Sequence, residues 1–140
     1  MANTVCTTFK SLTLKGDHDF ANDTFKMALY TSSASSLADY TAYATTNEAS
    51  GTNYTAGGQA LSGGTVALSG TTAYVDFDDE AWTSITITAR YALIYNTSAA
   101  LTTNAACFFL DFTEDKTATN GTFTVVFPAA GASAVLTLTG

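Results

Sequence analysis

Charged residues are scarce in this chain, and basic residues are the scarcest. Only 12% of its 140 residues are charged, against roughly 25% in typical soluble domains. Five bases stand against 12 acids, which gives a net charge of −7. Binding to phosphate backbones needs lysine and arginine gathered on one face. We therefore expect no nucleic-acid partner, because the bases are scattered singly at Lys10, Lys15, Lys26, Arg90 and Lys116.

Cysteine is also rare. Cys6 and Cys107 are too few and too far apart for a disulfide framework or a four-ligand zinc site. Cys107 lies in the apolar run 105–110, so we expect it to be a small buried hydrophobic residue. The sequence places no histidine beside either cysteine, and we expect no thiol chemistry from them.

Long apolar runs are missing as well. None approaches the roughly 18 residues that cross a bilayer, so we expect no membrane partner. The opening MANTVC lacks a basic segment followed by an apolar one, which is the pattern of a secretory signal. We expect the product to be in the cytoplasm at synthesis.

The densest β-forming stretch is residues 81–96, which carries the only tryptophan and the only arginine. Alternation predicts a central strand, because successive strand side chains point to opposite faces. One face, the predicted core, holds Ile85, Ile87, Ala89, Tyr91, Leu93 and Tyr95. Trp82 and Arg90 fall on the other face, with Ser84, Thr86 and Thr88. Acidic runs precede and follow this strand, so Arg90 is expected to form a structural or intersubunit ion pair.

Further strands are predicted on both sides of this one. Residues 24–31 alternate cleanly, and residues 65–69 and 72–77 flank Gly70-Thr71 as a hairpin. The Thr-rich residues 4–15 favour a strand, although Phe9 and Leu12 also fit helical spacing. After a loop at 97–104 come strands at 105–112, 122–127 and 134–138, with a turn at 114–121 and a break at Pro128.

Together these strands predict one domain over residues 1–140. About eight short strands without a convincing helix indicate an all-β fold, an antiparallel β-sandwich or barrel-like sandwich. Residues 32–64 are small, polar and Gly-rich and form one long loop. Tyr40, Tyr43 and Tyr54 either belong to an interface or fold back over the sheet, and both alternatives stay open here.

No residue constellation in the sequence predicts catalysis. His18 lies between Asp17 and Asp19, which is ordinary polar turn chemistry in the absence of an identifiable nucleophile. The acidic groups at 76–80 and 111–115 offer oxygen ligands for Ca²⁺, but their spacing matches no EF-hand, and a solvated strand end is the simpler interpretation. We expect no enzyme activity, no cofactor and no metal.

Four blocks of the sequence resemble a family of small virion structural proteins of tailed bacteriophages. They are HDF..DTFKMALYTSSA (18–34), NEASGTNYTAGGQALSG (47–63), VDFDDEAWTSITITARYALIYN (75–96) and LDFTEDKTATNGTFTVVFP (110–128). They occur in the same order and include the motifs E.SG..YTAGG, W.S.T.TAR and DF..DK...G.F. The resemblance covers nearly the whole chain.

The resemblance implies a non-enzymatic particle component made in the host bacterial cytoplasm and located in the virion. The preferred role is a capsid decoration or cement protein that binds the outer surface of the major capsid protein lattice as a dimer or trimer. Tyr40, Tyr43, Tyr54 and Arg90 are the predicted interface residues. The alternatives are a tail or fibre component of the same particle and a carbohydrate-binding β-sandwich.

Overall fold

Two long antiparallel strands frame the fold. The structure is a computed structural model that describes residues 2–139. The two long strands are β6 (Glu80–Asn96) and β7 (Ala105–Val125), joined by a loop at 97–104 as predicted. Their pairing runs from Asn96 with Ala105 to Glu80 with Val125. β-branched and aromatic side chains at alternate positions favour such a ladder. We refer to the paired strands as the β6–β7 ribbon.

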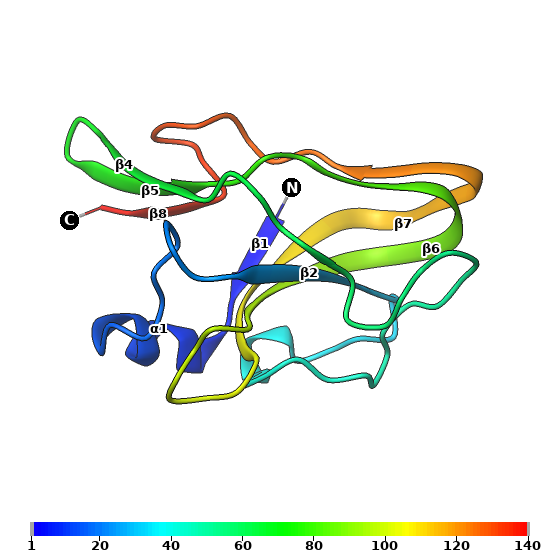
Figure 1. Cartoon of the computed structure of the whole chain (residues 1–140), viewed down its shortest axis with the longest axis horizontal. Helices are drawn as coiled ribbons and strands as arrows, with labels where there is room; N and C mark the ends of the chain where they lie inside the picture. The colour runs from blue at the N-terminus through cyan, green and yellow to red at the C-terminus, as the bar shows by residue number, and fades with distance from the viewer. Residues whose placement is uncertain (1, 140) are drawn as a thin grey trace.

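The ribbon belongs to a five-stranded antiparallel sheet in the order β1-β7-β6-β2-β3 (Figure 1). Its other members are β1 (Ala2–Val5), β2 (Phe25–Tyr30) and β3 (Gln59–Ala60). A three-stranded sheet in the order β4-β5-β8 contains β4 (Thr65–Ser69), β5 (Thr72–Asp76) and β8 (Leu136–Leu138). The prediction of an all-β antiparallel fold of about eight strands is confirmed, and within residues 2–139 the sheets do not close into a barrel.

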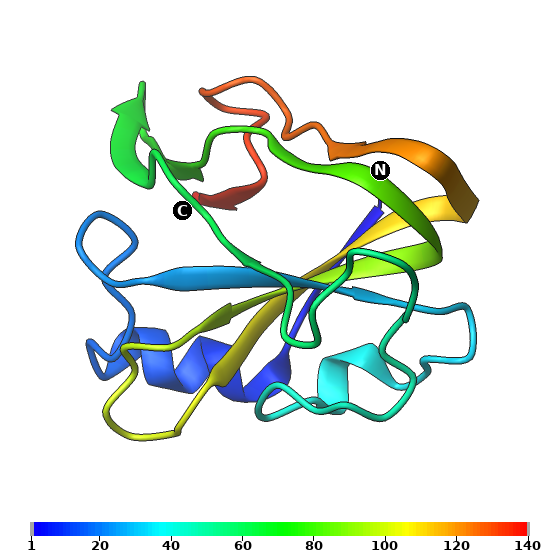
Figure 2. The ribbon, with the colours of Figure 1, turned by 45° about the vertical axis from the view of Figure 1, so that its right-hand side comes forward.

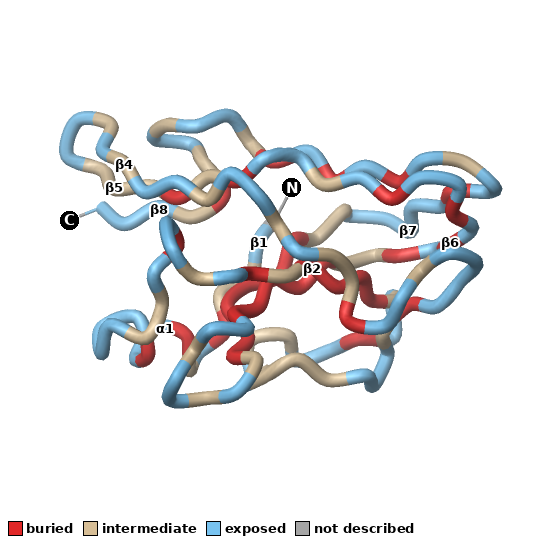
Figure 3. The backbone as a smooth tube through the Cα atoms, in the orientation of Figure 1, coloured by how far each residue is buried: buried red, intermediate tan, exposed pale blue. Residues whose placement is uncertain are grey.

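The ribbon curls, and its curl builds the second layer. Figure 2 shows it leaving the five-stranded sheet and bending, so that its far end lies above that sheet, on the same side of it as β5 and β8. Four register shifts interrupt its ladder, and Ser84 and Asn120 adopt positive φ angles of 50° and 49°. Bulges increase local twist and bend a strand. Most of the buried residues belong to the five-stranded sheet (Figure 3). Between the two layers, the ring centres of Phe25 of β2 and Phe77, just after β5, lie 5.8 Å apart.

The first bulge corrects the predicted faces of β6. Trp82, expected opposite the core, is 3% exposed, because the register shift between Trp82 and Ile85 inserts a residue and changes the alternation. Of the six predicted core residues all are buried except Tyr91, which is half-buried. Beyond Tyr91 the strand is covered on both faces, so Ala92 and Ile94 are buried too.

Residues 114–121 are not the predicted turn but lie within β7. Lys116, Thr117 and Ala118 pair with Ala89, Thr88 and Ile87 of β6. The segment is polar because the far part of the ribbon exposes one face to solvent, and threonine is well suited to such a half-buried strand. The strands predicted at 105–112 and 122–127 are therefore one strand.

The predicted strand at 4–15 is also wrong, since β1 ends at Val5 and the helix α1 covers Thr7–Leu14. Phe9 and Leu12, three residues apart, form its buried face, and Phe9 packs edge-on against Phe108 at 6.4 Å. The helix ends in a Schellman motif, because Gly16 has φ +79° and the Asp17 N–H bonds to the Leu12 carbonyl. The helical spacing of Phe9 and Leu12, rather than the threonine content, therefore indicated the structure of this segment after Val5.

Several other predicted elements are confirmed. β2 lies within the predicted 24–31, and β4 and β5 form the predicted hairpin around Gly70, which has φ +60°. β8 is shorter than the predicted 134–138. No helix in the described part of the chain is long and apolar enough to cross a membrane.

Candidate functional site

The predicted long loop is largely tied to the edge of β2. It contains only a short 3-10 helix, η1 (Leu37–Asp39), and β3, but its backbone replaces a missing neighbour strand. The Ala49 N–H donates to the Leu29 carbonyl and the Thr31 N–H donates to the Asn47 carbonyl. The loop is therefore ordered by backbone hydrogen bonds within its own chain.

Glu48 organises the middle of this loop. Its Oε2 accepts a hydrogen bond from Tyr43 Oη at 2.6 Å, and its Oε1 accepts from Tyr54 Oη at 2.8 Å and from the Gly57 N–H at 2.7 Å. Tyr54 Oη in turn accepts the Leu29 N–H at 2.9 Å. Burial and the neighbouring carboxylate raise the pKa of Tyr43 and of Tyr54, so both phenols stay neutral and donate.

The three predicted interface tyrosines therefore fold back over the sheet, as one of the two alternatives held. Tyr40 packs edge-on against Phe109 and Tyr43 stacks on Tyr95, with the ring centres 4.9 Å apart in each pair. All three rings are half-buried. Their role in an interface stays a prediction, and their main visible function is to hold the loop.

Arg90 forms an ion pair with Asp111, with Nε and Oδ1 2.7 Å apart across the ribbon. This confirms the predicted ion pair and places the acid within the same chain. The hydrogen bond from Arg90 lowers the pKa of Asp111, and the Thr113 N–H, which also donates to Oδ1, adds to this. The guanidinium lies 5.3 Å from the centre of the Tyr91 ring. An intersubunit role for Arg90 stays a prediction.

His18 lies in a polar cluster that the sequence did not predict. Its Nδ1 is 3.0 Å from the amide nitrogen of Asn96, which is fully buried, and 4.0 Å from Cys107 Sγ. The expectation that no histidine lies beside a cysteine is therefore wrong, because β2 and the ribbon bring distant segments together. Asn96 also donates to Asp23 Oδ2 at 2.8 Å. Asp17 and Asp19 form the predicted polar turn, with Asp17 accepting the Ala100 N–H.

This cluster is not arranged for nucleophilic catalysis. Cys107 is fully buried, and desolvation raises the pKa of its thiol well above the usual value. Only the thiolate is nucleophilic, so the sulfur is inert at neutral pH. Burial lowers the pKa of His18, which keeps its ring neutral. The cluster packs and satisfies a buried amide.

The acidic residues that suggested calcium do not converge. Asp78 accepts from Ser62 Oγ, Asp79 from the Phe127 N–H, and Glu80 from Gln59 Nε2. Among residues 2–139 no group of three or more histidine, cysteine, aspartate or glutamate side chains is placed to hold a metal ion.

An open apolar groove lies between α1 and the three-stranded sheet. This groove, of about 680 Å³, is lined from one side by Phe9, Leu14 and Phe20 and from the other by Val75, Leu136 and Leu138. Leu14 is 90% exposed and Leu138 is 73% exposed. We call this the α1 groove. Contiguous exposed apolar surface marks contact sites with other molecules. The groove was not predicted from the sequence, because Leu14 was assigned to a strand and lies in α1 instead.

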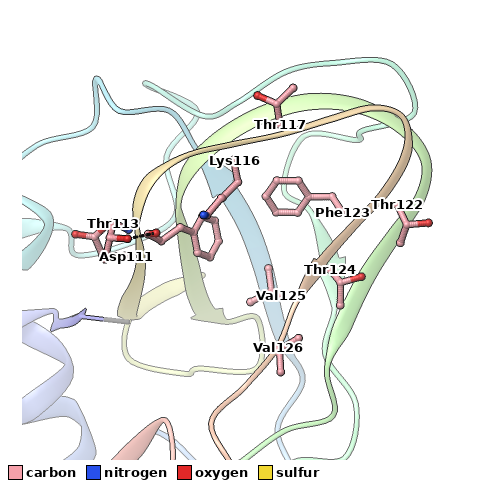
Figure 4. A pocket seen from close by; sticks show the side chains of 10 residues that line it. Asp111, Thr113, Lys116, Thr117, Thr122, Phe123, Thr124, Val125 and Val126 are labelled. Carbon is pink, nitrogen blue, oxygen red and sulfur yellow. Dashed lines mark hydrogen bonds between the residues drawn. The ribbon is translucent and has the colours of Figure 1, made fainter.

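A second groove of about 440 Å³ lies along the curled part of β7. The groove is lined on one side by the earlier part of β7, with Asp111, Lys116 and Thr117 (Figure 4). The later part of the strand lines the other side, with Phe123 and Val125. Phe123 and Val125 are buried, and threonines surround the opening. The groove follows from the curl of the ribbon and holds no catalytic grouping.

No protein-family model, no curated protein and no solved structure matches this chain.

Proposed function

We propose that this protein is a non-enzymatic structural component of a tailed-bacteriophage virion, most specifically a capsid decoration protein on the outer surface of the head lattice. The observation that carries the proposal is the α1 groove, an exposed apolar surface in a chain with few charges. Such a surface supports a lasting protein contact. The placement in a phage particle rests on the four sequence blocks described above.

The proposed mechanism is thermodynamic. A protein that binds the assembled lattice but not the free capsid subunit adds its binding free energy to the closed shell. The partner is then the major capsid protein, and the protein itself is a dimer or trimer so that it bridges neighbouring capsomers. Residues of the α1 groove, above all Leu14 and Leu138, contact the lattice.

A non-enzymatic role is also supported by the chemistry of the polar clusters. The thiol of Cys107 is buried and neutral, and the Glu48 carboxylate is engaged by two phenols and a backbone N–H. The carbohydrate-binding alternative depended on Trp82 and the tyrosine-bearing loop as a stacking surface. Trp82 is packed in the core at 3% exposure, and the three tyrosines of the loop are half-buried. A tail or fibre location remains the alternative within the same particle.

Location and copy number test the proposal directly. Mass spectrometry of purified particles, together with a low-resolution map, should find hundreds of copies coating the head. A few copies up to a few dozen, located at the tail, would replace the decoration role with the tail role. Absence of the protein from purified particles would exclude both.

The contact surface is tested with heads that lack the protein. The double variant Leu14→Asp/Leu138→Asp should bind such heads at least about tenfold more weakly than the wild type, because it places charge in the apolar contact. Leu101→Asp is the control, since Leu101 is 60% exposed, lies in the loop between β6 and β7 and does not line the groove. Equal loss in the control would show that the α1 groove is not the contact.

A further inference from the structure

β4 is an unprotected sheet edge. It pairs only with β5 within the described residues, and with five residues it is longer than the other edge strands β1, β3 and β8. Natural proteins protect such edges with charges, proline, bulges or very short strands. β4 carries none of these: its sequence is TVALS, and its register with β5 is unbroken.

The apolar side chains of β4 are exposed at this edge. Val66 is 51% exposed and Leu68 is 74% exposed. They pair with Val75 and Ala73 of β5, which pair in turn with Leu136 and Leu138 of β8. Because residues directly opposite each other share a face, these six side chains form one apolar face of the small sheet. That face ends abruptly at the β4 edge.

Charge makes this edge suitable for contact between two identical chains. The protein has a net charge of −7, so two copies carry a net electrostatic repulsion. Residues 60–75 form a stretch with no charged side chain, and β4 lies in it. Two copies that meet here bring no like charges together, and this argues for a second copy of the chain as the occupant.

We propose that β4 pairs antiparallel with β4 of a second copy about a two-fold axis at Ala67, joining the two small sheets into one six-stranded sheet. The strand is self-complementary in this register, because Val66 then lies opposite Leu68 of the other copy and Thr65 lies opposite Ser69. The four apolar side chains come together on one face. The pairing does not depend on the location of the protein in a particle.

The backbone is suited to the same register. The β4–β5 hairpin has a two-residue connection, so Ser69 and Thr72 form the hydrogen-bonded pair that closes it. Hydrogen-bonded pairs alternate with non-hydrogen-bonded pairs along an antiparallel ladder, so Ala67 and Thr65 also form hydrogen-bonded pairs with β5. The N–H and C=O groups of Val66 and Leu68 therefore point away from β5. In the proposed register these groups bond to each other across the axis. A five-residue edge is small beside standard interfaces, so we expect a dissociation constant in the micromolar range, on the order of 10 µM or weaker.

Cysteine cross-linking tests the register. In the proposed dimer the two Ala67 residues form a non-hydrogen-bonded pair with Cα atoms about 4.5 Å apart, within the range of a disulfide. Ala67→Cys should therefore give an intermolecular disulfide under mild oxidation. Ser69→Cys is the matched control, because its two copies would lie on the order of 13 Å apart. The native Cys6 and Cys107 are fully buried and do not compete.

Sedimentation from about 1 µM to about 1 mM tests the association itself. The wild type should show a discrete monomer–dimer equilibrium, and Val66→Lys/Leu68→Lys should raise the dissociation constant at least about tenfold without lowering the melting temperature. Leu101→Lys/Val126→Lys, with residues 60% and 59% exposed, is the control and should dimerise like the wild type. A monomer throughout this range, a dimer insensitive to the β4 lysines, open-ended aggregation, or equal cross-linking of both cysteine variants would overturn the proposal.

Discussion

Arg90 and Asp111 face each other across the ribbon, and each is about one quarter exposed. We expect Arg90→Ala to lower the melting temperature, because it leaves Asp111 without its cation at a bulge where Asp111 also accepts the Thr113 N–H. Lys116→Ala is the matched control. Lys116 pairs with Glu114 in an exposed ion pair, and such pairs contribute little to stability. Thermal melting checks this, and an equal effect in both variants would contradict it.

The same ion pair should show in acid. The pKa of Asp111 is lowered from its usual 3.8, so its contribution to stability is present above pH 3.8 and is lost as the pH falls through the lower folded-state pKa. The stability difference between the wild type and Asp111→Asn should therefore be largest at neutral pH and shrink below about pH 4. Melting temperatures along a pH series test this, and a difference independent of pH would exclude the ionic origin.

Tyr54 and Tyr43 both donate a hydrogen bond to Glu48, but only Tyr54 also accepts one from a backbone N–H. Tyr54→Phe removes the hydrogen bond to Glu48 and also removes the acceptor of the Leu29 N–H, which donates to Tyr54 Oη. An unpaired buried N–H costs about 1–3 kcal/mol. Tyr43→Phe removes one bond and strands no backbone group, so it should cost about 0.5–1.5 kcal/mol. Urea unfolding should rank Tyr54→Phe as the more destabilising, and the reverse order would contradict this account of the loop.

His18 should make the fold sensitive to mild acid. Asn96 donates to Nδ1, so the neutral ring carries its proton on Nε2, and protonation of Nδ1 would set two donors against each other. Burial lowers the pKa below the usual 6.5, although Asp17 and Asp23 act in the opposite direction. Below pH 6.5 the unfolded chain therefore binds a proton that the folded chain does not, and stability falls. His18→Gln should flatten the melting temperature between pH 7.5 and pH 5, and an unchanged slope would contradict this.

At the scale of the element, close approach of the long loop to β2 depends on Gly58. Gly58 has φ +73°, and a Cβ there would lie 1.7 Å from the Met27 carbonyl oxygen. We expect Gly58→Ala to destabilise the fold by about 2–4 kcal/mol, from the strained φ and the clash together. Gly16→Ala is the control, since Gly16 has φ +79° with open space around it, and it should cost only about 1 kcal/mol. Urea unfolding distinguishes them, and equal losses would show that the loop is not packed this closely.

Elements with one strong local signal could be predicted from the sequence. β2 alternates cleanly, and the β4–β5 hairpin is marked by its Gly-containing connection. α1 has conflicting signals, because threonine favours strands while the spacing of Phe9 and Leu12 and the helix-ending Gly16 indicate a helix. The polar part of β7 could not be predicted, because its pairing with β6 is a long-range contact that overrides the turn-like composition of residues 114–121.

The candidate sites depended even more on long-range contacts. Asp111 as the partner of Arg90 was one of several acids available by sequence, and only the ribbon register selects it. The cluster of His18, Asn96 and Cys107 joins residues 78 and 89 positions apart, so no local pattern could reveal it. The α1 groove is formed by the helix and the small sheet together, and no pattern in the sequence of either element indicates it.

At the scale of the whole molecule, the ribbon makes the two layers one folding unit. One end of the β6–β7 ribbon pairs with β1 and β2 in the five-stranded sheet, and the other end bends to the side on which the small sheet lies (Figures 1 and 2). The chain ends reinforce this connection, since the Asn3 side chain donates to the Val135 carbonyl at 3.2 Å, linking the segments of β1 and β8. Neither layer can separate without opening the core between them.

We therefore expect a single cooperative unfolding transition. Trp82, the only tryptophan, lies on the ribbon and packs against Tyr54 of the loop and Phe123 of β7, each with ring centres 6.3 Å away. Its fluorescence reports the core between the layers, whereas far-UV circular dichroism reports all strands. The two urea transitions should coincide, as for a two-state domain. If the small sheet and the returning end of the ribbon opened separately, the fluorescence would change at lower urea than the dichroism, and the two layers would have to be treated as independent units.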